Sequence, residues 1–167
     1  MKLRKLEPKD SSLMLEWMHD ESVVKYLAKD FSKMTEEDCK QFIEASRKDV
    51  YNEHYAIVDE NDQYMGTVSL KSILNGSAEF AITMCAGAMG KGVAIMAMEQ
   101  MLKRGFEELE LKYIYWYVSH KNERALRFYD KNAFSRINKT FLEIKVGNKM
   151  EVAGDFVWYL EECTKRK

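Results

Sequence analysis

Residues 89–94 form the segment whose composition most directly suggests chemistry. They read Met-Gly-Lys-Gly-Val-Ala and lie between a strand-like run and a strongly periodic helical one. Glycines let the backbone approach a ligand closely, and free N–H groups at the start of a helix favour a phosphate there. A pyrophosphate would suit this loop, but a tight strand-to-helix turn that binds nothing explains the two glycines equally well.

Helical and strand periodicities predict the elements that position this loop. In chain order they are a strand at 2–6, helices at 13–18, 23–27 and 35–48, strands at 55–58, 64–70 and 78–84, a helix at 93–105, a strand at 113–118, a helix capped by Asn122, and a closing hairpin of 134–146 and 149–160 around Gly147 and Asn148. The second, third and fourth strands form an antiparallel meander. The predicted fold class is α/β, with a mixed, mostly antiparallel central sheet flanked by helices.

The composition indicates one folded domain over residues 1–167. Hydrophobic residues make up 46% of the chain and aromatic residues 12%, as in ordinary packed proteins. The 26 Lys and Arg nearly balance the 27 Asp and Glu, so no basic field would attract nucleic acid or anionic lipid. No apolar run approaches the ~18 residues of a membrane span. We expect a cytoplasmic protein with no nucleic-acid or membrane partner.

Cysteine and histidine spacing gives no signal for a disulfide framework or a metal site. The three cysteines, Cys39, Cys85 and Cys163, are odd in number and widely spaced, which favours a reducing compartment. The three histidines are scattered without metal-ligand spacing. No metal is therefore expected, and the basic C-terminal residues 165–167 are expected to be frayed.

Four stretches together resemble one enzyme family. The family's phosphate loop runs Gln or Arg, two variable residues, Gly, one variable residue, then Gly or Ala, and the chain matches at Gly92 and Ala94. Met89 departs from the first position, which removes a polar side chain but leaves the backbone donors. The other similar stretches are residues 3–10, 78–82 and 122–129. The chain resembles the GNAT superfamily of N-acetyltransferases, in its branch of ribosomal-protein, spermidine and nucleotide-sugar amine acetyltransferases.

This resemblance implies the GNAT fold, acetyl-CoA as co-substrate and a set of residues that bind it. The implied phosphate loop comprises Met89, Gly90, Lys91, Gly92, Val93 and Ala94. Main-chain contacts to the pantetheine arm are implied for Ile82, Thr83 and Met84, and contacts from the later helix for Asn122 and Ala125. Without the resemblance, residues 82–84 are interpreted as part of an ordinary buried strand and Asn122 as a helix N-cap.

Two side chains are candidates for the proton transfers of direct acetyl transfer. The reaction needs a neutral amine, a polarised carbonyl and a proton for the departing sulfur. The resemblance assigns Tyr129 to the departing thiolate. Glu79 is the candidate base, directly or through water, because partial burial on a central strand makes a carboxylate more basic. The residues alone leave open that Tyr129 is a core aromatic and Glu79 an edge carboxylate.

The leading hypothesis is an acetyl-CoA-dependent N-acetyltransferase that modifies a primary amine by direct transfer. No His lies beside Cys85, so no acyl-enzyme is expected. The acceptor is a small molecule such as an amino sugar, a nucleotide-linked sugar or a polyamine, or else a protein N-terminus. It is expected between residues 17–34 and the closing hairpin, with Tyr26, Asp30 and Phe31 lining its pocket. The alternative is a non-catalytic module that senses acetyl-CoA or docks to a partner. An ATP-binding loop is disfavoured, because the Lys-Ser/Thr ending of a Walker loop is absent.

The closing hairpin also predicts self-association. Its aromatic residues give one small domain much apolar surface to bury, and they are Phe156, Trp158 and Tyr159. We therefore expect a homodimer.

Overall fold

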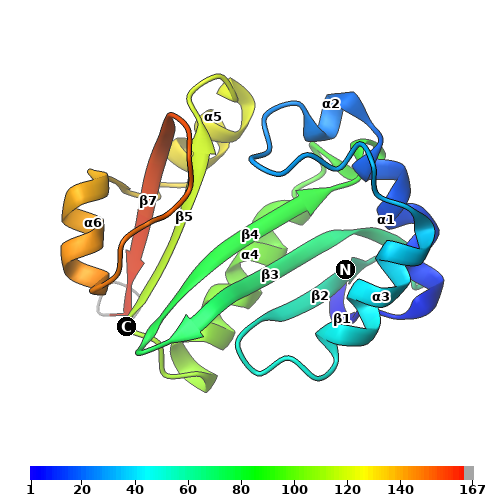
Figure 1. The fold of residues 1–167 in the computed structure, drawn as a ribbon, viewed down its shortest axis with the longest axis horizontal. Helices are drawn as coiled ribbons and strands as arrows, with labels where there is room; N and C mark the ends of the chain where they lie inside the picture. The colour runs from blue at the N-terminus through cyan, green and yellow to red at the C-terminus, as the bar shows by residue number, and fades with distance from the viewer. Residues whose placement is uncertain (164–167) are drawn as a thin grey trace.

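The computed structural model describes residues 1–163 as a seven-stranded sheet flanked by helices (Figure 1). The C-terminal residues 165–167, predicted to be frayed, lie outside the described residues. The helices are α1 (Ser11–Met18), α2 (Glu21–Val24), α3 (Glu36–Ser46), α4 (Val93–Lys103), α5 (Glu123–Lys131) and α6 (Lys139–Val146). The strands are β1 (Lys2–Lys5), β2 (Glu53–Val58), β3 (Tyr64–Leu74), β4 (Ser77–Met84), β5 (Tyr113–Ser119), β6 (Arg136–Ile137) and β7 (Phe156–Glu162).

The strands follow the order β1-β2-β3-β4-β5-β7-β6, and only the β4–β5 pair is parallel among the described strands. The predicted meander is confirmed by the antiparallel run of β2, β3 and β4. The parallel contact is short, since its last residue pair joins Glu79 to Tyr115. Beyond that pair the two strands diverge, as Figure 1 shows. The sheet is therefore mixed and mostly antiparallel, as predicted.

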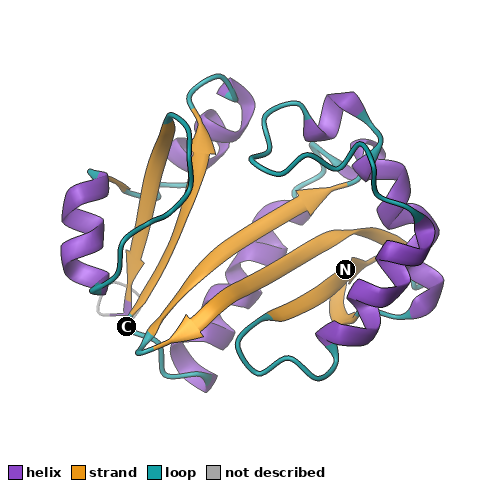
Figure 2. Cartoon of the chain, viewed as in Figure 1, coloured by secondary structure: helices purple, strands orange, loops and turns teal. Residues whose placement is uncertain are grey.

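Alternate side chains of each strand point to opposite faces of the sheet, which places them in different core clusters. On β2, Ile57 packs in the cluster built around α4, whereas its neighbours Ala56 and Val58 pack with α1 and α3. On β5, Trp116 belongs to the α4 cluster and Tyr115 packs with α6. One face of the sheet is thus covered by α4, and the other by α1, α3 and α6 (Figure 2).

The predicted closing hairpin is wrong, because residues 139–146 form helix α6. The Asn138 side chain accepts hydrogen bonds at 2.8 and 3.3 Å from two backbone N–H groups of the first turn, which caps the helix. Gly147, with a φ of 83°, ends it in the left-handed conformation. Only Leu142 of this helix is buried, so the apolar spacing along it is weak. The chain then returns as β7, which pairs with β5 and β6.

The aromatic residues behind the homodimer prediction are also placed differently from what we expected. Trp158 and Tyr159 are 5% and 0% exposed, respectively. Trp158 packs in one cluster with Leu142 of α6, and Tyr159 stacks on Trp116 with ring centroids 5.5 Å apart. These side chains complete the chain's own core, so they supply no surface for a second copy.

Membrane spans, metal clusters and disulfides are absent from the described part of the chain. No helix there is long and apolar enough to cross a membrane. Within residues 1–163, no three His, Cys, Asp or Glu side chains are grouped closely enough to hold a metal ion. The three cysteines are free thiols.

A buried ion pair beside β1 generates a stability prediction. Asp10 is 2% exposed, and its two oxygens accept hydrogen bonds from Arg4 Nη1 and Nη2 at 2.8 and 2.9 Å. Removing the carboxylate leaves the Arg4 guanidinium partly buried without its main partner. We therefore expect Asp10→Ala to lower the free energy of unfolding by about 3 kcal/mol in urea denaturation. Asp62→Ala, which removes a more exposed partner of the same guanidinium, should cause a smaller loss. Equal losses in the two variants would contradict the prediction.

Candidate functional site

A groove opens where β4 and β5 diverge. It has a cavity volume of about 260 Å³ and is lined by both strands, by α5 and by the segment that follows α2. The sequence-predicted residues that line it are Glu79, Ile82, Thr83, Asn122, Ala125 and Tyr129. The fold therefore brings both candidate proton-transfer residues and part of the predicted coenzyme contacts into one groove.

The main chain of β4 supplies unpaired polar groups along this groove. Residues 80–84 pair with β3 on one side, and no described strand pairs with them on the other. An unpaired strand edge presents a row of N–H and C=O groups, which an extended ligand can bind as an added strand. Successive residues of a strand turn their backbone groups to opposite edges, so Ile82 faces the groove, whereas the carbonyl of Thr83 faces Gly66 of β3. The Met84 side chain is only 6% exposed and packs in the core, so a ligand at this residue would contact only its backbone.

Glu79 lies at the closed end of the divergence, in the last residue pair between β4 and β5. Its side chain is 20% exposed, and Oε2 lies 3.0 Å from Nζ of Lys71, the residue opposite on β3. Burial raises the pKa of the nearby Tyr115 to about 12, and the negative charge of Glu79 adds to that effect. Glu79 is thus a partly buried, ion-paired carboxylate inside the groove rather than a group at the solvent edge.

Tyr129 approaches the groove from the face of the sheet that α4 covers, opposite the face that carries Glu79. Its ring is 7% exposed and packs against Trp116 and Tyr159, with centroid distances of 5.4 and 5.1 Å. Burial raises the pKa of the Tyr129 hydroxyl well above its usual range. A neutral phenol that lines the groove can donate a proton there. The core-aromatic and groove-lining interpretations of this residue are therefore compatible.

Asn122 serves as the N-cap of α5 and also lines the groove. Its Oδ1 accepts a hydrogen bond from the backbone N–H of Ala125 at 3.2 Å. The predicted cap is confirmed by this bond. The cap fixes the start of α5, and α5 in turn carries Tyr129.

The glycine loop follows β4 and leads directly into α4. Gly90 and Gly92 have φ values of 77° and 75°, a left-handed conformation that favours glycine. Gly92 is the N-cap of α4, and no side chain caps this end of the helix. The first N–H groups of α4 are consequently available to an anion. The loop does not line the groove itself, and Met89 packs against the core.

Side chains of Val93 and Ala94 in this segment likewise face inward. Val93 is 8% exposed within the main core cluster, and Ala94 packs against that cluster. Lys91 is exposed. Three residues of the segment, Met89, Val93 and Ala94, thus use their side chains for packing, which leaves mainly the backbone of residues 89–94 for a ligand.

Several groove residues were not named individually as site residues by the sequence analysis, although Lys29 and Phe156 fall in the two segments predicted to hold the acceptor. They are Lys29, Lys71, Trp116, Tyr117 and Phe156. Alternation along β5 could have suggested Tyr117, whereas nothing local distinguishes the two lysines from surface lysines. Trp116 Nε1 is buried and has no hydrogen-bond partner within the described residues.

Two of the three residues expected near the acceptor border the groove. Tyr26 and Phe31 line it, and Phe31 packs edge-on against Trp17 with ring centroids 5.2 Å apart. Asp30 does not line the groove: it is exposed, and its carboxylate accepts a hydrogen bond from the backbone N–H of Ser32 at 2.9 Å.

Burial raises the pKa of the Cys85 thiol to about 11, which disfavours a thiolate nucleophile.

Comparisons with known proteins agree with this architecture. Residues 1–135 match the family model for the acetyltransferase (GNAT) domain. The spermidine N(1)-acetyltransferase of Escherichia coli K12 is 31% identical over 144 residues, which cover 81% of this chain and 73% of that protein. Acetyltransferase PseH of Campylobacter jejuni is 24% identical over 130 residues, covering 78% of this chain and 80% of that protein.

Solved structures show the same fold. The spermidine N-acetyltransferase of Vibrio cholerae in complex with CoA and spermine has a TM-score of 0.81 and 20% identity, covering 98% of this chain and 96% of that chain. A dodecameric structure of that enzyme has a TM-score of 0.75 and 20% identity, covering 99% and 95% of the two chains. Because the family model spans most of the chain, this protein belongs to the GNAT family of acetyltransferases, which use acetyl-CoA as the acetyl donor.

Proposed function

We propose that this enzyme transfers the acetyl group of acetyl-CoA directly to a primary amine bound in the β4–β5 groove. The observation that carries the proposal is the meeting of three features in one place. The unpaired edge of β4, the Glu79 carboxylate and the Tyr129 hydroxyl all belong to the same groove. The uncapped start of α4 lies a short loop beyond the end of β4.

The chain's own groups would hold the donor along this path. The backbone N–H groups at the start of α4 bind the diphosphate, because they are uncapped and carry the positive end of the helix dipole. The edge of β4 at Ile82 binds the amides of the pantetheine arm through main-chain hydrogen bonds, and Thr83 lines the groove beside it. Asn122 and Ala125, at the start of α5, border the other side of that arm.

Two proton transfers complete the proposed reaction. The amine nitrogen attacks the thioester carbonyl carbon, the C–S bond breaks and its electron pair goes to sulfur. Tyr129 gives its hydroxyl proton to that sulfur, and Glu79, directly or through a water molecule, takes the proton that the amine loses. The raised pKa keeps Tyr129 neutral over the physiological range, so the proton it must donate is present.

The acceptor is proposed to bind on the face of the sheet that carries Glu79. Tyr26, Phe31 and Phe156 border the groove there. Both an amine on a small molecule and a protein N-terminus remain in the proposal. A non-catalytic module that only senses acetyl-CoA is the alternative, and thiol release with a panel of amines discriminates the enzyme from the sensor.

The free thiols of all three cysteines support a reducing, cytoplasmic location.

A first prediction tests the phosphate loop. Nothing lies within 4 Å of a Cβ built at Gly92, so Gly92→Val adds a branched side chain in open space where the diphosphate would approach. We expect the Kd for acetyl-CoA, measured by calorimetry, to rise at least about tenfold. Gly147→Val is the matched control, because Gly147 has a similar φ of 83° and equally open space but lies at the end of α6. A rise of less than about twofold at Gly92 would refute the loop assignment.

A second prediction tests Tyr129. Tyr129→Phe removes one proton donor and almost no volume, so kcat should fall at least ~100-fold where chemistry limits turnover. Acetyl-CoA affinity and thermal stability should change little, because the ring and the loop remain. Tyr159→Phe is the control: its hydroxyl donates to Asp130 at 2.9 Å and is not part of the groove lining. If kcat of Tyr129→Phe fell less than about threefold, Tyr129 would be a core aromatic only.

A third prediction concerns assembly. We propose a homodimer, now through the outer face of α6, where Phe141 and Ile144 are 64% and 70% exposed one turn apart. A similar fold assembles as a dodecamer in the Vibrio enzyme, which supports self-association. Sedimentation at micromolar concentration should give a dimer, and the double variant Phe141→Ser, Ile144→Ser should give a monomer. A monomeric native protein would overturn this proposal.

A further inference from the structure

The acceptor face of the groove carries a net positive charge. Among the described residues that line the groove, the charged side chains are Lys29, Lys71 and Glu79. Lys71 Nζ lies 3.0 Å from Glu79, so these two charges offset one another. The third charge, the Lys29 ammonium, therefore sets the sign of the acceptor face.

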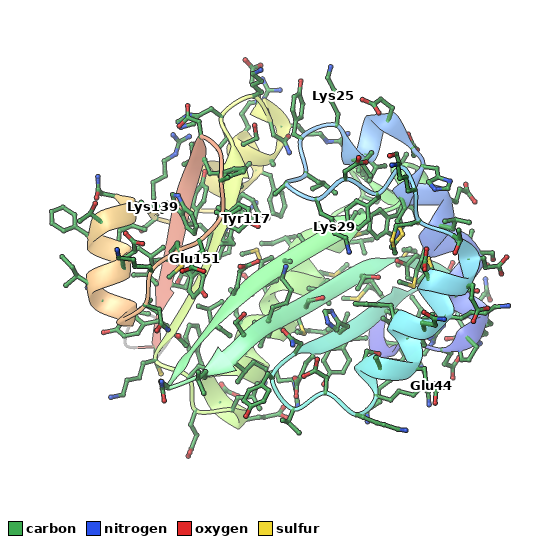
Figure 3. All side chains as sticks on the ribbon, in the orientation of Figure 1. Lys25, Lys29, Glu44, Tyr117, Lys139 and Glu151 are labelled. Carbon is green, nitrogen blue, oxygen red and sulfur yellow. The ribbon has the colours of Figure 1, made fainter. Side chains whose placement is uncertain are left out.

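Lys29 is placed to meet a ligand. It follows α2 on an exposed segment, and no ion pair to Lys29 is found among residues 1–163. Its Nζ lies 5.3 Å from the centroid of the Phe31 ring, which also lines the groove. In Figure 3, Lys29 lies on the β4 side of the divergence and Tyr117 on the β5 side. The pKa of Asp38, outside the groove lining, is lowered first by the backbone hydrogen bond from Thr35 and to a smaller extent by the charge of Lys29. An acceptor between Lys29 and Tyr117 would lie close to an ammonium that has no ion pair in the described part of the chain.

Aromatic rings form both walls of the acceptor face. Tyr117 and Phe156 contact each other with ring centroids 4.8 Å apart, and Tyr26 joins Phe31 on the opposite wall. Ring faces bind the apolar face of a sugar or a base, and they add area without adding charge. The acceptor face thus combines flat apolar walls with one unpaired ammonium.

This charge pattern disfavours a polyamine. A polyamine keeps at least one ammonium group after its reacting nitrogen is deprotonated, and that group needs carboxylates around it. The only carboxylate in the groove lining of the described chain is Glu79, which is already paired with Lys71. The remaining ammonium of the polyamine would instead meet Lys29, and like charges repel.

We propose that the acceptor is an amine that also carries a phosphate group, with its amino group at Glu79 and its phosphate at Lys29. A phosphorylated amino sugar satisfies both the aromatic walls and the free cation. This inference rests on the proposed acetyl transfer and adds its acceptor class. Lys29 becomes the residue that determines specificity, because a lysine ammonium binds phosphate as a compact positive charge.

The test compares three amines on the enzyme saturated with CoA. Calorimetry measures Kd for glucosamine, for glucosamine 6-phosphate and for spermidine. We expect glucosamine 6-phosphate to bind at least about tenfold more tightly than glucosamine, and spermidine to bind most weakly. Raising the salt concentration should narrow the difference, because the contact is electrostatic and exposed. Uridine diphosphate glucosamine, as a fourth amine, tells whether a nucleotide-linked phosphate is preferred to a free sugar phosphate.

Charge reversal at one residue supplies the matched comparison. Lys29→Glu should abolish the preference for the phosphorylated sugar and improve spermidine binding. Lys33→Glu makes the same change in net charge four residues later, where the side chain is exposed and lies outside the groove lining. This control should keep the native order of affinities.

The outcomes are distinguishable. Equal binding of the two sugars, spermidine binding as tight as that of the phosphorylated sugar, absence of binding up to about 10 mM, or no effect of Lys29→Glu would each overturn the inference. None of these results touches acetyl-CoA binding or the Tyr129 variant. The proposed function fails separately, if acetyl-CoA does not bind or no amine is acetylated.

Discussion

The parallel contact between β4 and β5 ends at the pair of Glu79 and Tyr115, and the groove depends on this early stop. Had the pairing continued, the backbone groups of Ile82 would be bonded to β5 and closed to any ligand. Instead, they stay unpaired at the centre of the molecule. Unpaired backbone groups are costly when water is excluded, so a ligand that bonds to them recovers free energy. The divergence converts a sheet edge into a binding surface.

Aromatic contacts keep the two halves of the sheet together in spite of this short pairing. Trp116 on β5 contacts Phe80 of β4 edge-on, with ring centroids 5.7 Å apart, and stacks on Tyr159 of β7. The same indole packs against Tyr129 of α5. The proposed proton donor, Tyr129, is therefore held by packing on a helix whose start is fixed by Asn122. The rigidity of the site comes from the core rather than from the groove.

Donor and acceptor sites are built from different kinds of groups. The donor path uses backbone N–H and C=O groups of the glycine loop and β4, which many side chains permit. The acceptor face uses the side chains of Lys29, Lys71 and Glu79, each of which one substitution can change. Membership of the acetyltransferase family thus fixes the donor much more firmly than the acceptor. For this reason a relative named for spermidine is compatible with a different acceptor here.

Local signals in the sequence determined most of the elements and predicted the residues of the proposed donor site. Periodicity gave the meander and α4, and the glycines and Asn122 act within a few residues of themselves, so their roles can be read without the fold. Helix α6 was mistaken for a strand because its single buried residue, Leu142, leaves no helical stripe. Only the tertiary structure brought Lys29 and Lys71 together with Glu79, because contacts between distant segments depend on strand order and on where β4 leaves β5.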